Sequence, residues 1–340
     1  MIVVVPTRRL ASARRVRRAR VQQCSKFIYK KLRVGKIKAF LLFFLDIKMI
    51  IDSEKNVHRW HKLQIRVAEA SIVNALKQLR AAQIEPILIK GLAISQMYPE
   101  NHPRIFQDVD LCVNPFEYQK AKDILEKNAA NSLHVDLHQG LRHLDNVSWE
   151  DLYENSRLYK LEETSIRILR PEDHLRVVCT HWLNDGGARK DRLWDIFYAV
   201  ENRPKDFEWD RFLEISGSKR RKWFVCTLGL AHKYLGLNLK ETPIAKEALS
   251  IPKWIIKTVE KEWGSEIRLK ALQGCLQNKK ELFEQIKKRI PPNPIQATIE
   301  MEGDFDNKPR IFYQIGDIFF RLPKSIKSVS GSISSKYKNK

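Results

Sequence analysis

Hydrophobic residues recur with two different periods in the first half of the chain. Residues 61–83 place apolar side chains at positions 65, 68, 72, 76 and 79, which is the spacing of one α-helical face. Residues 87–89 are a short apolar run, Gly91 permits a tight turn, and residues 92–97 fit a short helix. A second apolar run covers residues 108–113 and ends at Asn114-Pro115. The pattern predicts helix, strand, turn, short helix and strand.

The pattern continues with one more helix and one more strand before it changes. Residues 115–128 fit a helix with Pro115 near its start, and LHVDL (133–137) alternates like a strand. Beyond residue 170, the segments 171–184, 192–202, 209–216 and 219–236 all have helical periodicity. We therefore expect an α+β fold, with a small mixed-sheet domain and flanking helices, followed by a helical C-terminal domain.

Composition shifts divide the chain into four predicted parts. They are a basic extension and helix (1–55), an α/β domain (56–169), a helical domain (170–290), and a C-terminal linker with a basic tail (291–340). The proline-rich stretch 288–296 marks the last break, and the Ser/Lys-rich end is predicted to be disordered. A chain of 340 residues is long enough for two hydrophobic cores.

The positive charge is concentrated at the two ends. Residues 1–48 carry fourteen Lys and Arg against one acid, and residues 321–340 carry six with no acid. Subtracting +13 and +6 from the net charge of +22 leaves +3 for residues 49–320. Nucleic acid therefore stays open as a partner of the tails, but the near-neutral body disfavours it.

The N-terminal segment and the cysteines bear on location. The acid-poor segment fits a transit peptide, an electrostatic arm, or an extension ahead of a start at Met49. Residues 39–51 are apolar but too short for a membrane span, and are predicted to be a helix packed on the core. The five cysteines are scattered without a C-x-x-C pair, which indicates free thiols, a reducing compartment and a cytoplasmic location.

Three aspartates lie in or beside the predicted strands. Since alternate strand residues share a face, Asp108 and Asp110 point one way while Val109 and Leu111 point into the core. The same alternation places Asp136 on one face of the third strand. If the two strands are neighbours, three carboxylates converge, and such oxygen ligands suit Mg²⁺. A D-x-D alone is common by chance, and the three histidines at 134, 138 and 143 lack a strong zinc spacing.

The residues at these positions resemble a known family. Lys90-Gly91, Arg104, Asp108-x-Asp110 and Val135-Asp136-Leu137-His138 are similar, in this order, to the polymerase-β-type nucleotidyltransferase superfamily. The closest similarity is to its poorly characterised bacterial branch, in which KG, R…DxDL and DLH recur. The resemblance covers roughly residues 60–240. The helical half also shares features with that branch. These features are Pro171-Glu172-Asp173, His181 and Leu193-Trp194-Asp195.

The resemblance implies a metal site. Asp108 and Asp110 would bind two Mg²⁺ ions, with Mn²⁺ as an alternative, and these ions would act on the nucleotide α-phosphate. Asp136 would hold the catalytic metal and help to deprotonate the acceptor hydroxyl. His138 would lie behind these ligands and orient them.

The resemblance also implies a nucleotide site. Gly91 would lie at the turn where the backbone approaches the triphosphate, and Lys90 and Arg104 would neutralise phosphate charge. The implied reaction is attack by a hydroxyl of a small molecule, sugar or protein on a nucleoside triphosphate, with loss of pyrophosphate.

Two other functions stay open. The turn is Lys-Gly followed by Leu92, where the superfamily usually has Gly-Ser or Gly-Gly, and only 25 residues separate Asp110 from Asp136. These departures leave open an inactive, antitoxin-like binding or regulatory protein that keeps the fold. The basic tails leave open a transferase acting on tRNA or another nucleic acid.

Overall fold

The computed structural model describes residues 54–106, 108–127, 135–141, 147–161, 164–214, 217–270, 272–275, 278–305 and 309–321. The chain divides into two compact units, 1–62 and 63–340, and the second contains both the sheet and the helices that follow it. The predicted helix at 39–51 and the Ser/Lys-rich end fall outside the described residues. Among the described helices, none has the length and hydrophobicity needed to cross a membrane.

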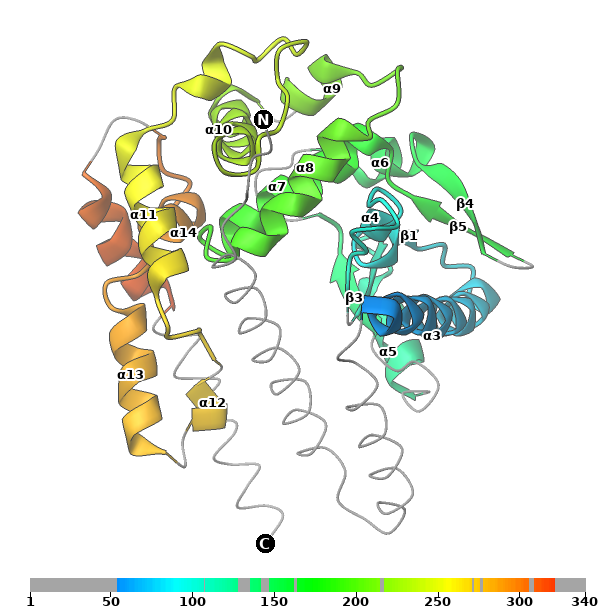
Figure 1. The fold of residues 1–340 in the computed structure, drawn as a ribbon. Coiled ribbons are helices and arrows are strands. Elements are labelled where there is room, and N and C mark those ends of the chain that lie inside the picture. Colours follow the sequence, from blue (N-terminus) through cyan, green and yellow to red (C-terminus); the bar gives the residue numbers. More distant parts are fainter. Residues whose placement is uncertain are drawn as a thin grey trace, which may run out of the picture. The chain divides into compact units, whose positions relative to one another are not determined.

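A five-stranded mixed sheet forms the first half of the larger unit, as predicted (Figure 1). Its strands are β1 (Ile87–Leu88), β2 (Val109–Val113), β3 (Val135–Gln139), β4 (Arg157–Leu161) and β5 (Thr164–Ile168). They lie in the order β3-β2-β1-β5-β4. Strand β2 pairs parallel to β3 and antiparallel to β1, while β1 pairs parallel to β5 and β5 antiparallel to β4.

Both faces of the sheet are covered by helices. Helices α3 (Glu54–Ala81) and α5 (Tyr118–Lys127) pack on the face that carries Val109, Leu111 and Val113. The predicted face of α3 is confirmed, because its residues 68, 72, 76 and 79 are buried there. The other face carries Cys112 and packs against α6 (Trp149–Glu154) and α7 (Pro171–Asn184). A strand covered on both faces reads as a nearly continuous apolar run, which explains the sequence of β2.

A second core lies among the helices that follow the sheet. It is formed by α7, α8 (Leu193–Glu201), α9 (Trp209–Leu213), α10 (Gly217–Leu235), α11 (Lys253–Gly264) and α14 (Pro294–Glu300). Trp182 and Trp223 are fully buried in it. The short helix α4 (Leu92–Ser95) contributes to both cores, since Leu92 lies in the sheet core and Ile94 in the helical one. The other α-helices in the described part of the chain are α12 (Leu272–Cys275), α13 (Lys279–Arg289) and a helix over residues 310–321.

The segment predicted to be a C-terminal linker and tail, residues 291–340, contains helix α14 and the helix over residues 310–321. The break at 288–296 is present, but Asn293 then caps α14 by accepting hydrogen bonds from the backbone N–H groups of Ile295 and Gln296. Ile295 and Ile299 are buried in the helical core. The polar, proline-rich stretch thus breaks one helix and starts another, because proline is tolerated in the first turn.

Strand limits also differ from the prediction, and several elements were not predicted. Strand β2 begins at Val109, one residue later than expected, and β3 runs over Val135–Gln139. The hairpin β4–β5 and helix α6 were missed. Four of the five residues of β4 lie outside the core, so its apolar periodicity is weak, and β5 becomes a strand through its pairing with β1.

Candidate functional site

The parallel register of β2 and β3 brings two of the predicted carboxylates together. Asp110 lies opposite Asp136, and Cys112 lies opposite His138. One ligand atom each from Asp110, Asp136 and His138 lies within 4.8 Å of the others. Asp108 is exposed and directly precedes β2, and its carboxylate is not part of this described group. The alternation therefore predicted the meeting of Asp110 and Asp136 correctly.

The Lys90 side chain contacts Asp110, the more buried of these two carboxylates. Its Nζ is 2.7 Å from Asp110 Oδ1, and His138 Nε2 is 2.9 Å from the same oxygen. The other neighbour of His138 Nε2 is Asp136 Oδ2, at 3.4 Å. The two acids differ in exposure, with 6% of the Asp110 side chain and 60% of the Asp136 side chain accessible. Asp110 is therefore an enclosed anion with two cationic or polar neighbours, and Asp136 opens to solvent.

The ionisation of Asp110 follows from these neighbours. Burial by itself raises the pKa of this carboxyl, but the hydrogen bond from His138 and the charge of Lys90 outweigh it and lower the pKa to about 2. Asp110 is thus charged at neutral pH, as a metal-binding or cation-binding carboxylate has to be.

Gly91 closes the turn between β1 and α4 in a conformation that requires glycine. Its φ is 51° and its ψ is −112°, and a Cβ at this position would lie 2.7 Å from the carbonyl oxygen of Asp108. The turn therefore lies directly against the start of β2, and a side chain would separate the two. This close approach places Lys90 beside Asp110.

Arg104 forms an ion pair with a helix of the second half. Its Nε and Nη2 donate to the two carboxylate oxygens of Asp195 in α8, at 2.6 Å and 2.9 Å. Its Nη1 lies 3.4 Å from the carbonyl oxygen of Gly91, and the Tyr98 hydroxyl donates to Asp195 Oδ1 at 2.6 Å. Burial, with the charge of Asp195, raises the pKa of Tyr98 above its ordinary range. Arg104, the predicted phosphate ligand, therefore lies beside the Lys-Gly turn. Most of its N–H donors already bind Asp195 or the Gly91 carbonyl oxygen.

The end of α7 adds charged groups near the carboxylates. Arg192 Nη1 hydrogen-bonds both His181 Nε2 and Asp185 Oδ2. Burial, followed by the charges of Arg192 and Lys90, lowers the pKa of His181 to about 3. The charge of Lys90 also acts on Asp185, whose pKa burial raises. From the sequence, His181 was named only as a feature that resembles the family branch, and Asp185 and Arg192 were not identified. The sequence signal for Asp185 is its four-residue spacing from His181, which places the two side chains on one side of the end of α7.

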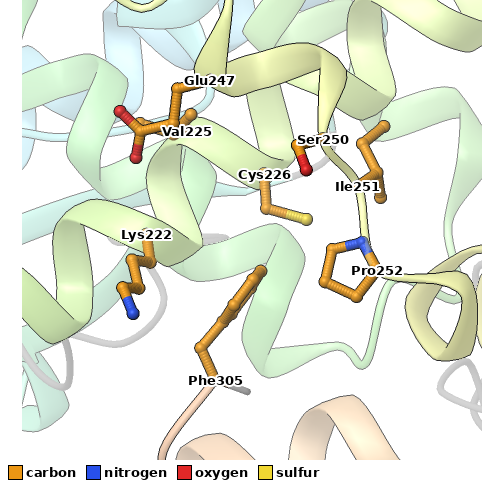
Figure 2. A pocket seen from close by; sticks show the side chains of 8 residues that line it. All are labelled: Lys222, Val225, Cys226, Glu247, Ser250, Ile251, Pro252 and Phe305. Atoms are coloured by element: carbon orange, nitrogen blue, oxygen red, sulfur yellow. The ribbon is translucent and has the colours of Figure 1, made fainter.

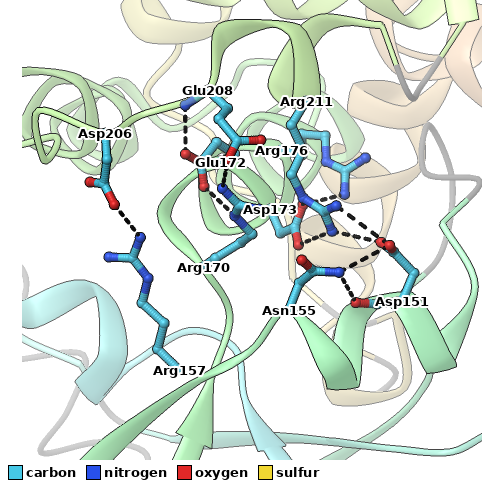
Figure 3. Close-up of polar contacts among 10 residues, drawn as sticks. All are labelled: Asp151, Asn155, Arg157, Arg170, Glu172, Asp173, Arg176, Asp206, Glu208 and Arg211. Carbon is cyan, nitrogen blue, oxygen red and sulfur yellow. Dashed lines mark hydrogen bonds and ion pairs between the residues drawn. The ribbon is translucent and has the colours of Figure 1, made fainter.

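The Pro-Glu-Asp motif at the start of α7 belongs to a separate ion-pair cluster (Figure 3). Asp173 has no exposed surface and accepts hydrogen bonds from Arg176 Nη2 at 2.6 Å and Arg211 Nη2 at 2.8 Å. Arg211 also donates to Asp151 of α6 at 2.6 Å. Glu172 accepts from Arg170 Nε and from the backbone N–H of Glu208, both at 2.8 Å. The motif therefore joins α6, α7 and α9 and lies apart from the Asp110 group.

A shallow hollow of about 270 Å³ lies among α10, the residues before α11 and Phe305 (Figure 2). Cys226 and Pro252 point into it, and Lys222 and Glu247 lie at its rim. Glu247 is already paired with Arg221, with an N–O distance of 2.5 Å. The hollow contains none of the residues predicted to act on a nucleotide, so we place the candidate site at Asp110 and Asp136.

Part of the chain is similar to a known protein family. Residues 50–236, more than half of the chain, match the model of a family described as uncharacterised nucleotidyltransferase. This span contains the Lys-Gly turn, the three aspartates and the end of α7. No curated protein and no solved structure matches the chain.

Proposed function

Because the chain belongs to the uncharacterised nucleotidyltransferase family, we propose that this site transfers a nucleoside monophosphate from a nucleoside triphosphate to a hydroxyl group. The acceptor would be a small molecule, a sugar or a protein. The observation that supports the proposal is the register of β2 and β3, which sets an enclosed carboxylate, Asp110, beside an open one, Asp136. The Lys-Gly turn lies against the same strand.

The donor atoms fit a hard divalent cation. The two carboxylates of the group, whose atoms lie within 4.8 Å of one another and of His138, suit Mg²⁺ or Mn²⁺, and the imidazole would orient them rather than bind the metal. Asp110 and Asp136, with Asp108 at the start of the strand, would hold the metal, which would neutralise phosphate charge and favour departure of pyrophosphate. The Lys90 ammonium, 2.7 Å from Asp110 Oδ1, now lies where a cation would bind. Nucleotide binding with metal therefore requires Lys90 to turn from Asp110 toward the phosphates.

The residues of the chain then have distinct roles. The acceptor oxygen forms a bond to the α-phosphorus, the bond from that phosphorus to the bridging oxygen breaks, and pyrophosphate leaves. Asp136, which is 60% exposed, takes the hydroxyl proton. Lys90 supplies positive charge to the phosphates, and Gly91 lets them approach the backbone. Arg104 adds charge beside the turn while Asp195 holds its position.

Nucleotide binding tests this proposal directly. ATP, GTP, CTP and UTP are titrated by calorimetry with and without Mg²⁺, and pyrophosphate release is followed for any that bind. We expect metal-dependent binding that Asp136→Asn weakens by tenfold or more, about 1.4 kcal/mol. Asp206→Asn, which alters an exposed acid paired with Arg157 at 3.4 Å, is the matched control. Binding that is independent of Mg²⁺, or equal in the two variants, would contradict the proposed site.

A specific contact favours a second function. Lys90 and His138 already hydrogen-bond Asp110 Oδ1, so the carboxylate is satisfied without a metal. A binding or regulatory protein that has kept the fold without turnover would have this arrangement. Nucleotide binding without release of pyrophosphate in the presence of candidate acceptors, or no binding by the folded protein, would favour this second function.

A further inference from the structure

The helix over residues 310–321 is red in Figure 1. The side chains on its polar side contact the rest of the fold. Gln314 Nε2 donates to the carbonyl oxygen of Pro292 at 2.5 Å, and Arg310 Nη1 donates to that of Asp304 at 2.7 Å. Asp317, on the same side of the helix, has no exposed surface. These contacts fix the rotation of the helix about its axis.

The opposite side of this helix is apolar and exposed. Its large side chains are 45–70% accessible and recur at positions i, i+1, i+4 and i+8, in Ile311, Phe312, Ile315 and Phe319. We call these four residues the apolar stripe. The Met301 side chain lies beside Gly316 and is itself 38% exposed. An amphipathic helix of a globular protein normally buries its apolar face, so the orientation is the reverse of the usual one.

Charge in the adjoining sequence favours one kind of partner. Residues 322–340, which follow the helix directly in the sequence, carry five Lys and no acid. Packing of an apolar stripe against another protein requires no adjoining positive charge. The surface of an anionic lipid bilayer attracts such a charge. We propose that the apolar stripe binds the surface of an anionic lipid bilayer.

The length of the helix fits attachment in the plane of a membrane. Twelve helical residues extend about 18 Å, well short of the hydrocarbon core of about 30 Å. Phe312 and Phe319 would enter the region between headgroups and acyl chains, and the lysines would contact the headgroups. One apolar element with one polybasic segment supplies the two signals that stable attachment requires.

Vesicle binding by the full chain tests the proposal. Sedimentation with vesicles of phosphatidylcholine alone, and of phosphatidylcholine with 30% phosphatidylglycerol, gives a partition coefficient for each protein. We expect binding only to the anionic vesicles, weakened by salt. Phe312→Ser/Phe319→Ser should lower the partition coefficient by about tenfold or more. The matched control, Phe116→Ser/Leu249→Ser, removes two apolar residues that are 94% and 64% exposed elsewhere and should leave it unchanged.

Other occupants of the stripe give different results. Equal binding of the stripe variant and the control would show that charge alone attaches the protein, and would overturn the proposal. If a second copy covers the stripe, Phe312→Ser/Phe319→Ser converts a dimer into a monomer and no anionic vesicle is bound. If residues 39–51 of the same chain cover it, the variant lowers the melting temperature without a change in partitioning. Preference for a nucleic acid over vesicles would equally overturn the lipid assignment.

Discussion

Arg104 and Asp195 form a two-hydrogen-bond ion pair between the loop that precedes β2 and helix α8. Only 16% of the arginine side chain and 7% of the aspartate side chain is accessible. The Tyr98 hydroxyl binds the same carboxylate, and the Tyr98 and Tyr198 rings are 4.6 Å apart. The sheet that carries the carboxylates and the helices that face them are therefore held together beside the Lys-Gly turn.

Removal of the charge of Asp195 should destabilise the fold. Asp195→Asn leaves the enclosed guanidinium of Arg104 without a full counter-charge, and we expect a loss of about 3 kcal/mol in the free energy of unfolding, measured in urea. Asp206→Asn breaks a pair whose side chains are 43% and 73% exposed, so its effect should stay within about 0.5 kcal/mol. Equal effects of the two substitutions would show that the Arg104 pair has no special structural role.

Replacement of Lys90 should affect metal and nucleotide in opposite directions. Lys90→Met removes the ammonium from Asp110 Oδ1, so the affinity for Mn²⁺ in the absence of nucleotide should rise, by roughly tenfold. The same variant loses a positive charge for the phosphates, so nucleotide affinity should fall. Mn²⁺ binding is measured by electron paramagnetic resonance and nucleotide binding by calorimetry. Weaker binding of both ligands would contradict the competition between Lys90 and the metal.

Gly91 should tolerate no side chain. In Gly91→Ala the new Cβ meets the carbonyl oxygen of Asp108 at a backbone φ of 51°, so we expect a loss of roughly 2–4 kcal/mol in unfolding free energy. Gly264→Ala is the control, because nothing lies within 4 Å of its added Cβ. Since Gly264 is the last residue of α11, alanine should be neutral or slightly stabilising there. A neutral Gly91→Ala in urea unfolding would show that the turn relaxes freely.

The buried His174 should make stability depend on pH. Burial lowers its pKa from 6.5 to about 4, and its Nε2 lacks a described hydrogen-bond partner. Between these values the unfolded chain binds a proton that the folded chain does not, so stability is lost as pH falls from 6.5 to 4. The full effect is about 3 kcal/mol. In His174→Asn, the new side chain keeps an N–H donor for the backbone of Ile89 and does not titrate.

The comparison of wild type with His174→Asn isolates this effect from other titrating groups. His181, whose pKa is about 3, and the carboxylates are common to both proteins. Unfolding in urea at several pH values should give a stability difference that changes between pH 4 and 6.5 and is constant above pH 7. A difference that is constant over the whole range would refute the role of His174.

Local pattern was sufficient to predict several of the buried elements, although it missed α6 and the hairpin β4–β5. The helical spacing of residues 65–79 identified the face of α3, and alternation placed Asp110 and Asp136 opposite the core side of their strands. The order of the Lys-Gly, Asp-x-Asp and Asp-Leu-His motifs indicated the nucleotidyltransferase family that residues 50–236 match. These features are encoded locally, because they depend on side chains a few residues apart.

The partners of the charged residues were decided by tertiary structure alone. Nothing local in Arg104 distinguishes a phosphate ligand from the partner of Asp195, 91 residues away in the sequence. The sequence determined which residues are charged, apolar or free of a side chain, and hence the faces of its helices and strands. The packing of helices on the sheet decided that Lys90 contacts Asp110, that His181 and Arg192 lie near it, and that the 310–321 helix exposes its apolar side. The physical reason is that ion pairs and burial depend on distance in space, which chain positions far apart do not specify.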